Sequence, residues 1–120
     1  MVGTDWLATL SALLAFPLPT DRPLDSRDQS AFLLRGVPAA AGPLHWALPT
    51  PNGLDYAVRE GPWKLLLDRE HAPQALYHLE DDPLELFDLR RAAPDQVARL
   101  RQLHEAQLRA IEDDPLRPGP

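Results

Sequence analysis

The chain offers four histidines as candidate catalytic or metal-binding side chains. They are His45, His71, His78 and His104. An imidazole can move a proton or bind a metal ion near neutral pH, and zinc-binding histidines on a helix typically have i, i+4 spacing. No two of these histidines have that spacing. We therefore predict that each one lies at the surface or at the edge of a strand, outside any metal site.

Nucleophile motifs and phosphate-binding loops are absent from the sequence. There is no cysteine, which excludes disulfides, thiolate metal ligands and a cysteine nucleophile. No serine stands in the G-x-S-x-G context of a nucleophile elbow, and the six glycines are isolated, so no glycine-rich loop could cradle a phosphate. The residues therefore indicate no catalytic, cofactor-binding or metal-binding position.

The charged side chains with suggestive spacing have plainer interpretations. Asp21, Asp25 and Asp28 lie at loop spacing but lack the alternating oxygen ligands, glycine turn and terminal Glu of a calcium loop. We expect them to be solvated helix caps and turn residues. Arg59 and Lys64, on neighbouring expected strands, could face an anionic substrate. The favoured alternative is that they face solvent or pair with acidic side chains.

Composition narrows the class of protein. A chain of 120 residues is the usual size of one soluble globular domain, and its net charge of −6 without a basic cluster excludes a nucleic-acid-binding surface. Its 14 prolines and 6 glycines predict stiff, irregular connections around a real core.

The apolar segment Trp6–Leu18 is not a convincing signal peptide. Asp5 and no Lys or Arg precede it, and Phe16-Pro17-Leu18-Pro19 is a poor cleavage site. The segment is also shorter than the roughly 20 residues that span a bilayer. As the chain stands, we expect a cytoplasmic protein without a membrane partner, although so apolar a start suggests that something upstream has been removed.

The stretch from Asp55 to Glu85 is the part of the chain with the clearest strand pattern. Strands are expected at Tyr56–Arg59, Trp63–Leu67 and Leu76–Leu79, because these runs are rich in aromatic, branched and leucine side chains. Glu60-Gly61-Pro62 and Asp81-Asp82-Pro83 are the expected turns. Leu44–Ala47 is a candidate fourth strand before a loop over Pro49–Gly53.

Helices are expected at both ends of the chain. Thr4 or Asp5 can cap a first helix, Trp6–Leu14, which Pro17 ends; its wide apolar stripe predicts burial over much of its surface. Asp25 or Ser26 can cap a short second helix that reaches Leu34, with Gly36 as its stop.

A last helix should begin at Pro94, a residue suited to a first helical turn. Its expected apolar face is formed by Val97, Leu100, Leu103, Leu108 and Ile111. The sequence therefore predicts an α+β fold: a small antiparallel sheet of three to four strands, a C-terminal helix packed on it, and an N-terminal helix.

Five short motifs follow one another in an order that resembles one known family. Thr4–Leu10 reads Thr-Asp-Trp-Leu-Ala-Thr-Leu, and Leu33–Gly36 reads Leu-Leu-Arg-Gly. Ala57–Leu65 matches the pattern A-V-R-x-G-x-W-K-L, and Leu76–Glu85 reads Leu-Tyr-His-Leu-Glu-Asp-Asp-Pro-Leu-Glu. Asp88-Leu89 then precedes the helix at Pro94. Nearly all of the chain resembles the C-terminal region of the sulfatases, arylsulfatase-like hydrolases of the alkaline-phosphatase superfamily.

Several positions depart from the motifs of that family. The family usually has proline, glycine, leucine and proline where this chain has Ala8, Ser26, Gln29 and Ala31. An arginine and an aromatic residue are replaced by Pro43 and His45. These changes relax turn and packing positions and touch no chemistry.

The resemblance implies a truncated fragment or structural subdomain of a sulfuric ester hydrolase. The family makes its formylglycine nucleophile from a C/S-x-P-S-R motif and holds calcium with Asp and Asn side chains. The motif is not in this chain, and the metal ligands would sit in the N-terminal catalytic half that it lacks. No catalytic, metal or cofactor residue carries over, so activity is expected only if the chain is joined to that catalytic domain.

The resemblance also implies the organisation and the partners. Residues 1–36 are expected to form the N-terminal helix and Pro-rich linkage, and residues 37–120 the sulfatase C-terminal-like subdomain, in one compact unit overall. The expected partner is a sulfatase catalytic domain, upstream or in trans. The alternative is a non-catalytic binding or dimerisation module that self-associates through the N-terminal helix.

Overall fold

The computed structural model describes residues 2–38, 42–51 and 53–114. These residues divide between two compact units, which we call the N-terminal unit, the residues up to Ala41 together with Asp114, and the sheet unit, Gly42–Asp113. Each unit has its own helices, and the sheet unit contains all four strands. The units are therefore described separately.

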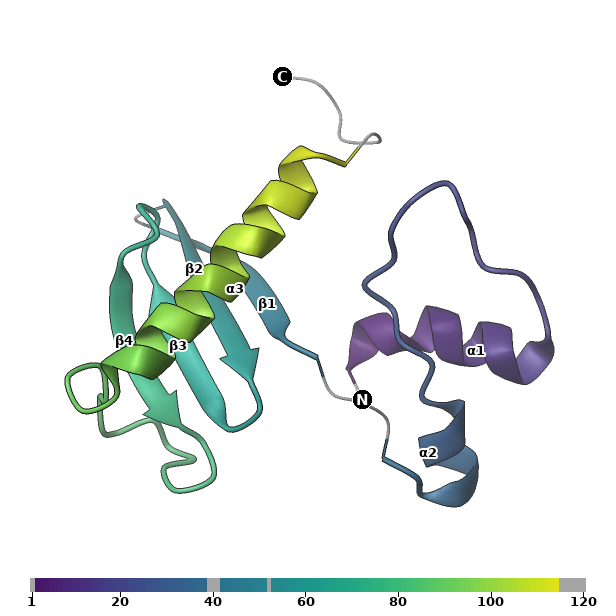
Figure 1. Cartoon of the computed structure of the whole chain (residues 1–120), viewed down its shortest axis with the longest axis horizontal. Coiled ribbons are helices and arrows are strands. Elements are labelled where there is room, and N and C mark those ends of the chain that lie inside the picture. Colours follow the sequence, from purple (N-terminus) through teal and green to yellow (C-terminus); the bar gives the residue numbers. More distant parts are fainter. Residues whose placement is uncertain (1, 39–41, 52, 115–120) are drawn as a thin grey trace. The chain divides into compact units, whose positions relative to one another are not determined.

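The N-terminal unit contains a single 3-10 turn, Gly3–Asp5, and two α-helices, α1 (Trp6–Leu14) and α2 (Ser30–Arg35) (Figure 1). The predicted first helix is confirmed, with Asp5 as its N-cap. It ends at Ala15, whose φ of 55° is left-handed and whose N–H donates to the carbonyl of Ser11. This turn precedes Pro17, so the chain leaves the helix before the proline.

The predicted start of the second helix is wrong. α2 begins at Ser30 rather than at Asp25 or Ser26, because the segment before it is tied to α1. The hydroxyl of Ser26 accepts the N–H of Ala8 at 2.7 Å, and the N–H of Gln29 donates to Thr9 Oγ1 at 3.0 Å. The Ser26 hydroxyl therefore accepts a hydrogen bond from α1 instead of capping α2. The predicted stop at Gly36 is confirmed by its left-handed φ of 66°.

The sheet unit is built on four antiparallel strands in chain order, as Figure 1 shows. They are β1 (Leu44–Thr50), β2 (Gly53–Glu60), β3 (Trp63–Leu67) and β4 (Pro73–His78). The predicted bounds of β3 are confirmed, and Gly61, at φ 57°, supplies the left-handed turn residue between β2 and β3.

Three strands are longer or earlier than predicted. β2 begins at Gly53 rather than at Tyr56. β1 continues through Pro49 to Thr50, which pairs with Gly53, so the predicted loop over Pro49–Gly53 is wrong. β1 is an edge strand, where a proline need not donate to a ladder. β4 begins at Pro73 rather than at Leu76, and Leu67 of β3 pairs with it.

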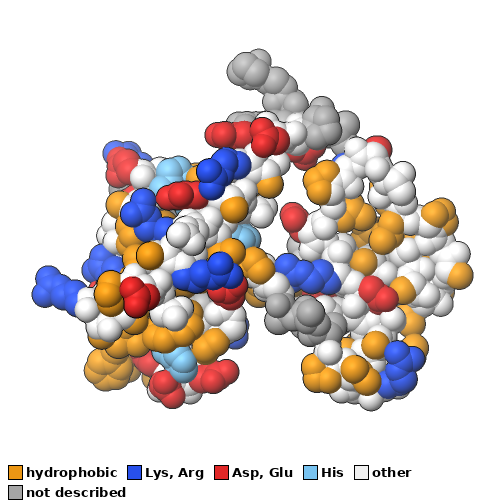
Figure 2. Space-filling model, viewed as in Figure 1, with side chains coloured by type: hydrophobic (Ala, Val, Ile, Leu, Met, Phe, Trp, Pro, Cys, Tyr) orange, Lys and Arg blue, Asp and Glu red, His pale blue; other side chains and the backbone are white. Residues whose placement is uncertain are grey.

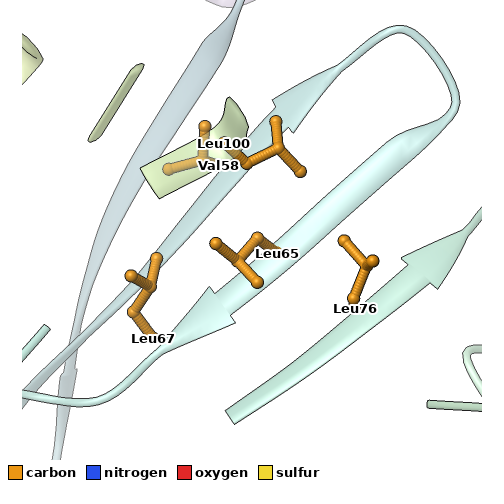
Figure 3. Packing of buried hydrophobic residues seen from close by; sticks show 5 residues of the cluster. All are labelled: Val58, Leu65, Leu67, Leu76 and Leu100. Atoms are coloured by element: carbon orange, nitrogen blue, oxygen red, sulfur yellow. The ribbon is translucent and has the colours of Figure 1, made fainter. Parts of the chain in front are cut away.

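The C-terminal helix α3 (Pro94–Glu112) crosses one face of the sheet (Figure 1), so the predicted α+β architecture is confirmed. Figure 3 shows how Leu100 of α3 meets strand side chains that point toward it. This fully or almost fully buried core consists of Val58, Leu65, Leu67, Leu76 and Leu100.

The predicted apolar face of α3 is confirmed for Val97, Leu100 and Leu103, which belong to the core or pack on it. It is wrong for Ile111, which is 48% exposed because it lies on the last turn of the helix. On the exposed side of α3, Arg99 ties the helix to β2, because its Nε and Nη2 atoms donate to the Glu60 carboxylate at 3.1 and 2.9 Å.

The segment between β4 and α3 is anchored by the carboxylate of Asp88. It accepts the N–H groups of Leu76 and Arg90 at 3.1 and 3.0 Å, and the Arg90 guanidinium at 2.8 Å. Burial alone would raise the pKa of Asp88, but these hydrogen bonds and the arginine charge hold it below its ordinary value. The Asp88 carboxylate thus ties the segment that leads into α3 at Pro94 to Leu76 of β4.

Removing the central leucine of α3 tests the packing of the sheet unit. We expect Leu100→Ala to lower its free energy of unfolding by about 2–5 kcal/mol, because the change leaves a cavity among fully buried side chains. Urea unfolding followed by circular dichroism measures the loss. Leu84→Ala is the control: Leu84 is 75% exposed, and we expect a change within about 0.5 kcal/mol. Equal effects of both changes would contradict the packing described.

Candidate functional site

The sheet face that α3 leaves uncovered is one candidate interaction surface. Alternation along the strands turns Val58 and Leu65 toward α3 and their neighbours away from it. The register aligns two rows on this second face, which we call the open face. One row is Trp46, Ala57, Leu66 and Ala75, and the other is Leu44, Arg59, Lys64 and Tyr77.

Apolar side chains on the open face are partly exposed in the sheet unit. Trp46 is 39% and Leu48 is 55% exposed, and both lie on the edge strand β1. Trp63, by contrast, packs against the hydrophobic core on the other face. A surface of this kind is typical of a site that another protein segment covers.

One end of the open face is hollowed. An open depression of about 850 Å³ lies over the strand residues Leu48, Asp55, Ala57 and Leu66. The loop residues Asp68, Arg69 and Glu70 line it as well. Its strand side is mostly apolar apart from Asp55, and its loop side is charged, which suits contact with a mixed protein surface more than an enclosed small-molecule site.

The two candidate cations do not form an anion site. Lys64 Nζ lies 2.7 Å from Glu85 Oε1, and both side chains are largely buried. This confirms, for Lys64, the interpretation as a partner for an acidic side chain. Arg59 is exposed, and its Nε donates to the carbonyl of Gly61 at 3.0 Å.

Two of the histidines meet, and for the buried His104 the prediction of a surface or strand-edge position is wrong. His71 Nδ1 lies 2.9 Å from His104 Nε2, and His104 is only 4% exposed. His104 falls four residues after Leu100 on the apolar stripe of α3, so helical spacing was the signal that could have found it. His78 packs edge-on against Trp63, with ring centroids 4.7 Å apart.

The acidic side chains of the N-terminal unit serve its backbone. Asp21 pairs with Arg22 at 3.0 Å, and Asp28 Oδ1 accepts the N–H of Ser30 at 2.8 Å, as predicted for turn and cap residues. In the described part of the chain, no group of three or more His, Cys, Asp or Glu side chains could hold a metal ion. None of the helices in the same residues has the length and apolar character needed to cross a membrane.

A buried polar network joins α1 to the segment before α2. Asp5 is 2% exposed, and its carboxylate accepts the N–H groups of Val2 and Arg27 at 3.0 and 3.2 Å. The hydrogen bond from Val2 is the main cause that lowers the pKa of Asp5; burial opposes it and the Arg27 N–H assists it. Thr9, also buried, links the same two segments.

The apolar side of α1 is not covered within this unit, although the sequence predicted its burial. Side chains that are 40–69% exposed form what we call the apolar helix face: Trp6, Leu7, Leu10, Leu13 and Leu14. Figure 2 shows such hydrophobic side chains on the surface of the N-terminal unit. The helix is instead held from its other side by the buried Ala8, Thr9 and Ser11.

Of three comparisons with known proteins, the one with solved structures gives matches. No family model matches the chain, and no curated protein matches it. Among the solved structures that do match is a sulfatase of Bacteroides thetaiotaomicron, BT33336S-sulf, described with that organism's metabolism of multiple glycosaminoglycans. The TM-score is 0.64, the sequence identity is 26%, and the match covers 85% of this chain.

The pair Ala8 and Ser26 yields a test of the N-terminal unit. Ala8 lies in the first turn of α1, where its N–H has no partner within the helix. We expect Ser26→Ala to cost about 1 kcal/mol in the wild-type background, and close to nothing in the Ala8→Pro background, where no N–H is left to satisfy. Hydrogen exchange of the α1 amides measures both values. Equal costs in the two backgrounds would contradict the pairing.

Only a part of the neighbouring sulfatase is matched. The chain spans 24% of that sulfatase. With 85% of this chain included, the match extends beyond the sheet unit alone. The chain is therefore similar in sequence and structure to one part of a sulfatase.

Proposed function

We propose that the chain is the C-terminal structural subdomain of a sulfatase-type hydrolase of sulfate esters. The single observation that carries this proposal is the match of 85% of the chain to 24% of a sulfatase at a TM-score of 0.64. The motif order supports the same assignment, because the A-V-R-x-G-x-W-K-L segment spans the β2–β3 hairpin of the structure.

In this proposal the open face and the apolar helix face bind the catalytic part of the enzyme. Both surfaces carry large apolar side chains that are partly exposed, such as Trp46 and Leu10. Burying apolar surface contributes about 25 cal/mol per Å², so a larger partner that covers either face would be bound favourably. The subdomain then acts by supporting the fold that borders the substrate cleft.

The catalytic groups of the family do not fit the residues of this chain. A formylglycine needs the C/S-x-P-S-R motif, which the sequence lacks, and calcium needs clustered oxygen ligands that the described residues do not offer. We therefore assign the nucleophile and the metal to the catalytic part and derive no chemical step for this chain. Cleavage of a sulfate ester would follow only from their combination.

A non-catalytic dimerisation module is the second candidate. The observation in its favour is the apolar helix face, which a second copy of the chain could cover. Such a module would form a dimer of defined stoichiometry, whereas a subdomain without its catalytic part would expose both faces and associate without fixed stoichiometry.

Activity of the isolated chain tests the first candidate. We expect no turnover of p-nitrophenyl sulfate by the purified chain, with or without added calcium, because its sequence lacks the C/S-x-P-S-R motif from which the family makes its nucleophile. A complete sulfatase is the positive control for the assay. Turnover that co-purifies with the chain and follows its concentration would refute the proposal.

Exposure of the apolar helix face can be tested with charged substitutions. We expect the wild-type chain to bind a hydrophobic dye and to self-associate, and the variant Leu10→Asp/Leu13→Asp to lose most of both signals. Leu84→Asp is the matched control, since Leu84 is exposed on a turn outside the face. Dye fluorescence and sedimentation velocity are the measurements.

The same experiment separates the two candidates. A single dimer species that the double aspartate variant converts to monomer favours the dimerisation module. Mixed oligomers with strong dye binding favour the subdomain. A wild-type monomer that binds no dye speaks against both, because neither face would then be available to a partner.

A further inference from the structure

A pair of histidines joins the β3–β4 loop to the helix α3. His71 lies on the loop and His104 on the helix, and a hydrogen bond of 2.9 Å connects Nδ1 of the first to Nε2 of the second. Such a bond needs a proton on one nitrogen and a lone pair on the other. If both rings are protonated, both nitrogens are donors and the bond cannot form.

The surroundings of the pair offer little compensation for a second positive charge. The ring of Tyr56 on β2 packs against both imidazoles, with centroids 4.7 Å from His71 and 5.0 Å from His104. His45 on β1 is near enough to act electrostatically on His104. Glu105 is the acidic group that favours a charged His104, but it also lies 3.6 Å from Arg101.

These groups act on His104 in a definite direction. Burial is the largest cause that lowers the pKa of His104 below its ordinary 6.5; positive charge on His71 and His45 lowers it further, and Glu105 opposes them. A native state that resists protonation is less stable wherever the unfolded chain binds the proton more readily. The stabilisation from this group is therefore fully present above pH 6.5 and lost as the pH falls below that value.

The loop is built to present His71 to the helix. Its residue Asp68 accepts the N–H groups of Glu70 and Ala72 at 3.0 and 2.9 Å, and the N–H of His71 donates to the carbonyl of Asp68 at 2.9 Å. His71 itself has a left-handed φ of 62°. That conformation is unfavourable for a non-glycine residue, so contacts of the loop and of the His71 side chain must offset it.

We propose that His71 and His104 form a pH-sensitive latch that holds the β3–β4 loop against α3 at neutral pH and releases it when both rings are protonated. Release also changes the hollow on the open face, because Asp68, Arg69 and Glu70 of the same loop line it. The latch would thus couple the shape of this surface to acidification.

Nuclear magnetic resonance of the full chain tests the latch directly. We expect contacts from the His71 ring to the Tyr56 and His104 rings at about pH 7.5, and their loss at about pH 5, where free imidazoles are protonated. Contacts between Val58 and Leu65 in the core should persist at both values. Persistence of the His71 contacts with both rings protonated would overturn the proposal.

Variants separate the latch from general acid sensitivity. We expect His71→Ala to raise the proton affinity of His104 several-fold, up to about tenfold, because the neighbouring charge and hydrogen bond are removed. His78→Gln is the matched control, since His78 contacts Trp63 at the far end of β4, and it should leave the titration of His104 unchanged. An unchanged His104 titration in His71→Ala, or a changed one in His78→Gln, would overturn the coupling.

Discussion

One helix can cover only one face of a sheet, and the structure of the sheet unit follows from that constraint. Leu100 of α3 completes a core with strand residues such as Val58, Leu65 and Leu76, all fully buried. Strand alternation then leaves every second side chain on the opposite face. Trp46 and Leu48 are exposed there because nothing within the unit is available to cover β1 on that side.

The N-terminal unit is stabilised differently. Hydrogen bonds of polar groups hold α1 to the segment before α2, while the large apolar side chains of α1 are exposed. Ala8 and Ser26 are one bonded pair in this network. The sulfatase motifs that the sequence resembles have proline, without an N–H, at the first position and glycine, without a side chain, at the second. Here the N–H of Ala8 donates to the hydroxyl of Ser26 at 2.7 Å. The two departures therefore compensate each other, because the N–H of Ala8, which the helix itself leaves without an acceptor, bonds to Ser26.

Local patterns predicted those elements that depend on local physics. β3 was predicted with its bounds because Gly61-Pro62 limits it on one side and the run itself is rich in aromatic and leucine side chains. The predicted bounds were wrong where contacts with residues distant in the sequence determine the structure. Ser26 bonds to α1 instead of capping α2, and the edge position of β1 accommodates Pro49. His104 was missed because metal spacing was considered for it and helical periodicity was not. The apolar stripe of α1 could be read from sequence, but what covers it could not.

The size of the core explains why the proposed role requires a partner. Five buried aliphatic side chains form the core of the sheet unit, and small domains bury a lower fraction of their surface than large ones. A partner that binds only the folded form stabilises it by mass action. The apolar row on the open face and the apolar helix face are the surfaces where such a partner would act. In the proposed role, the chain would support a catalytic body through these two surfaces.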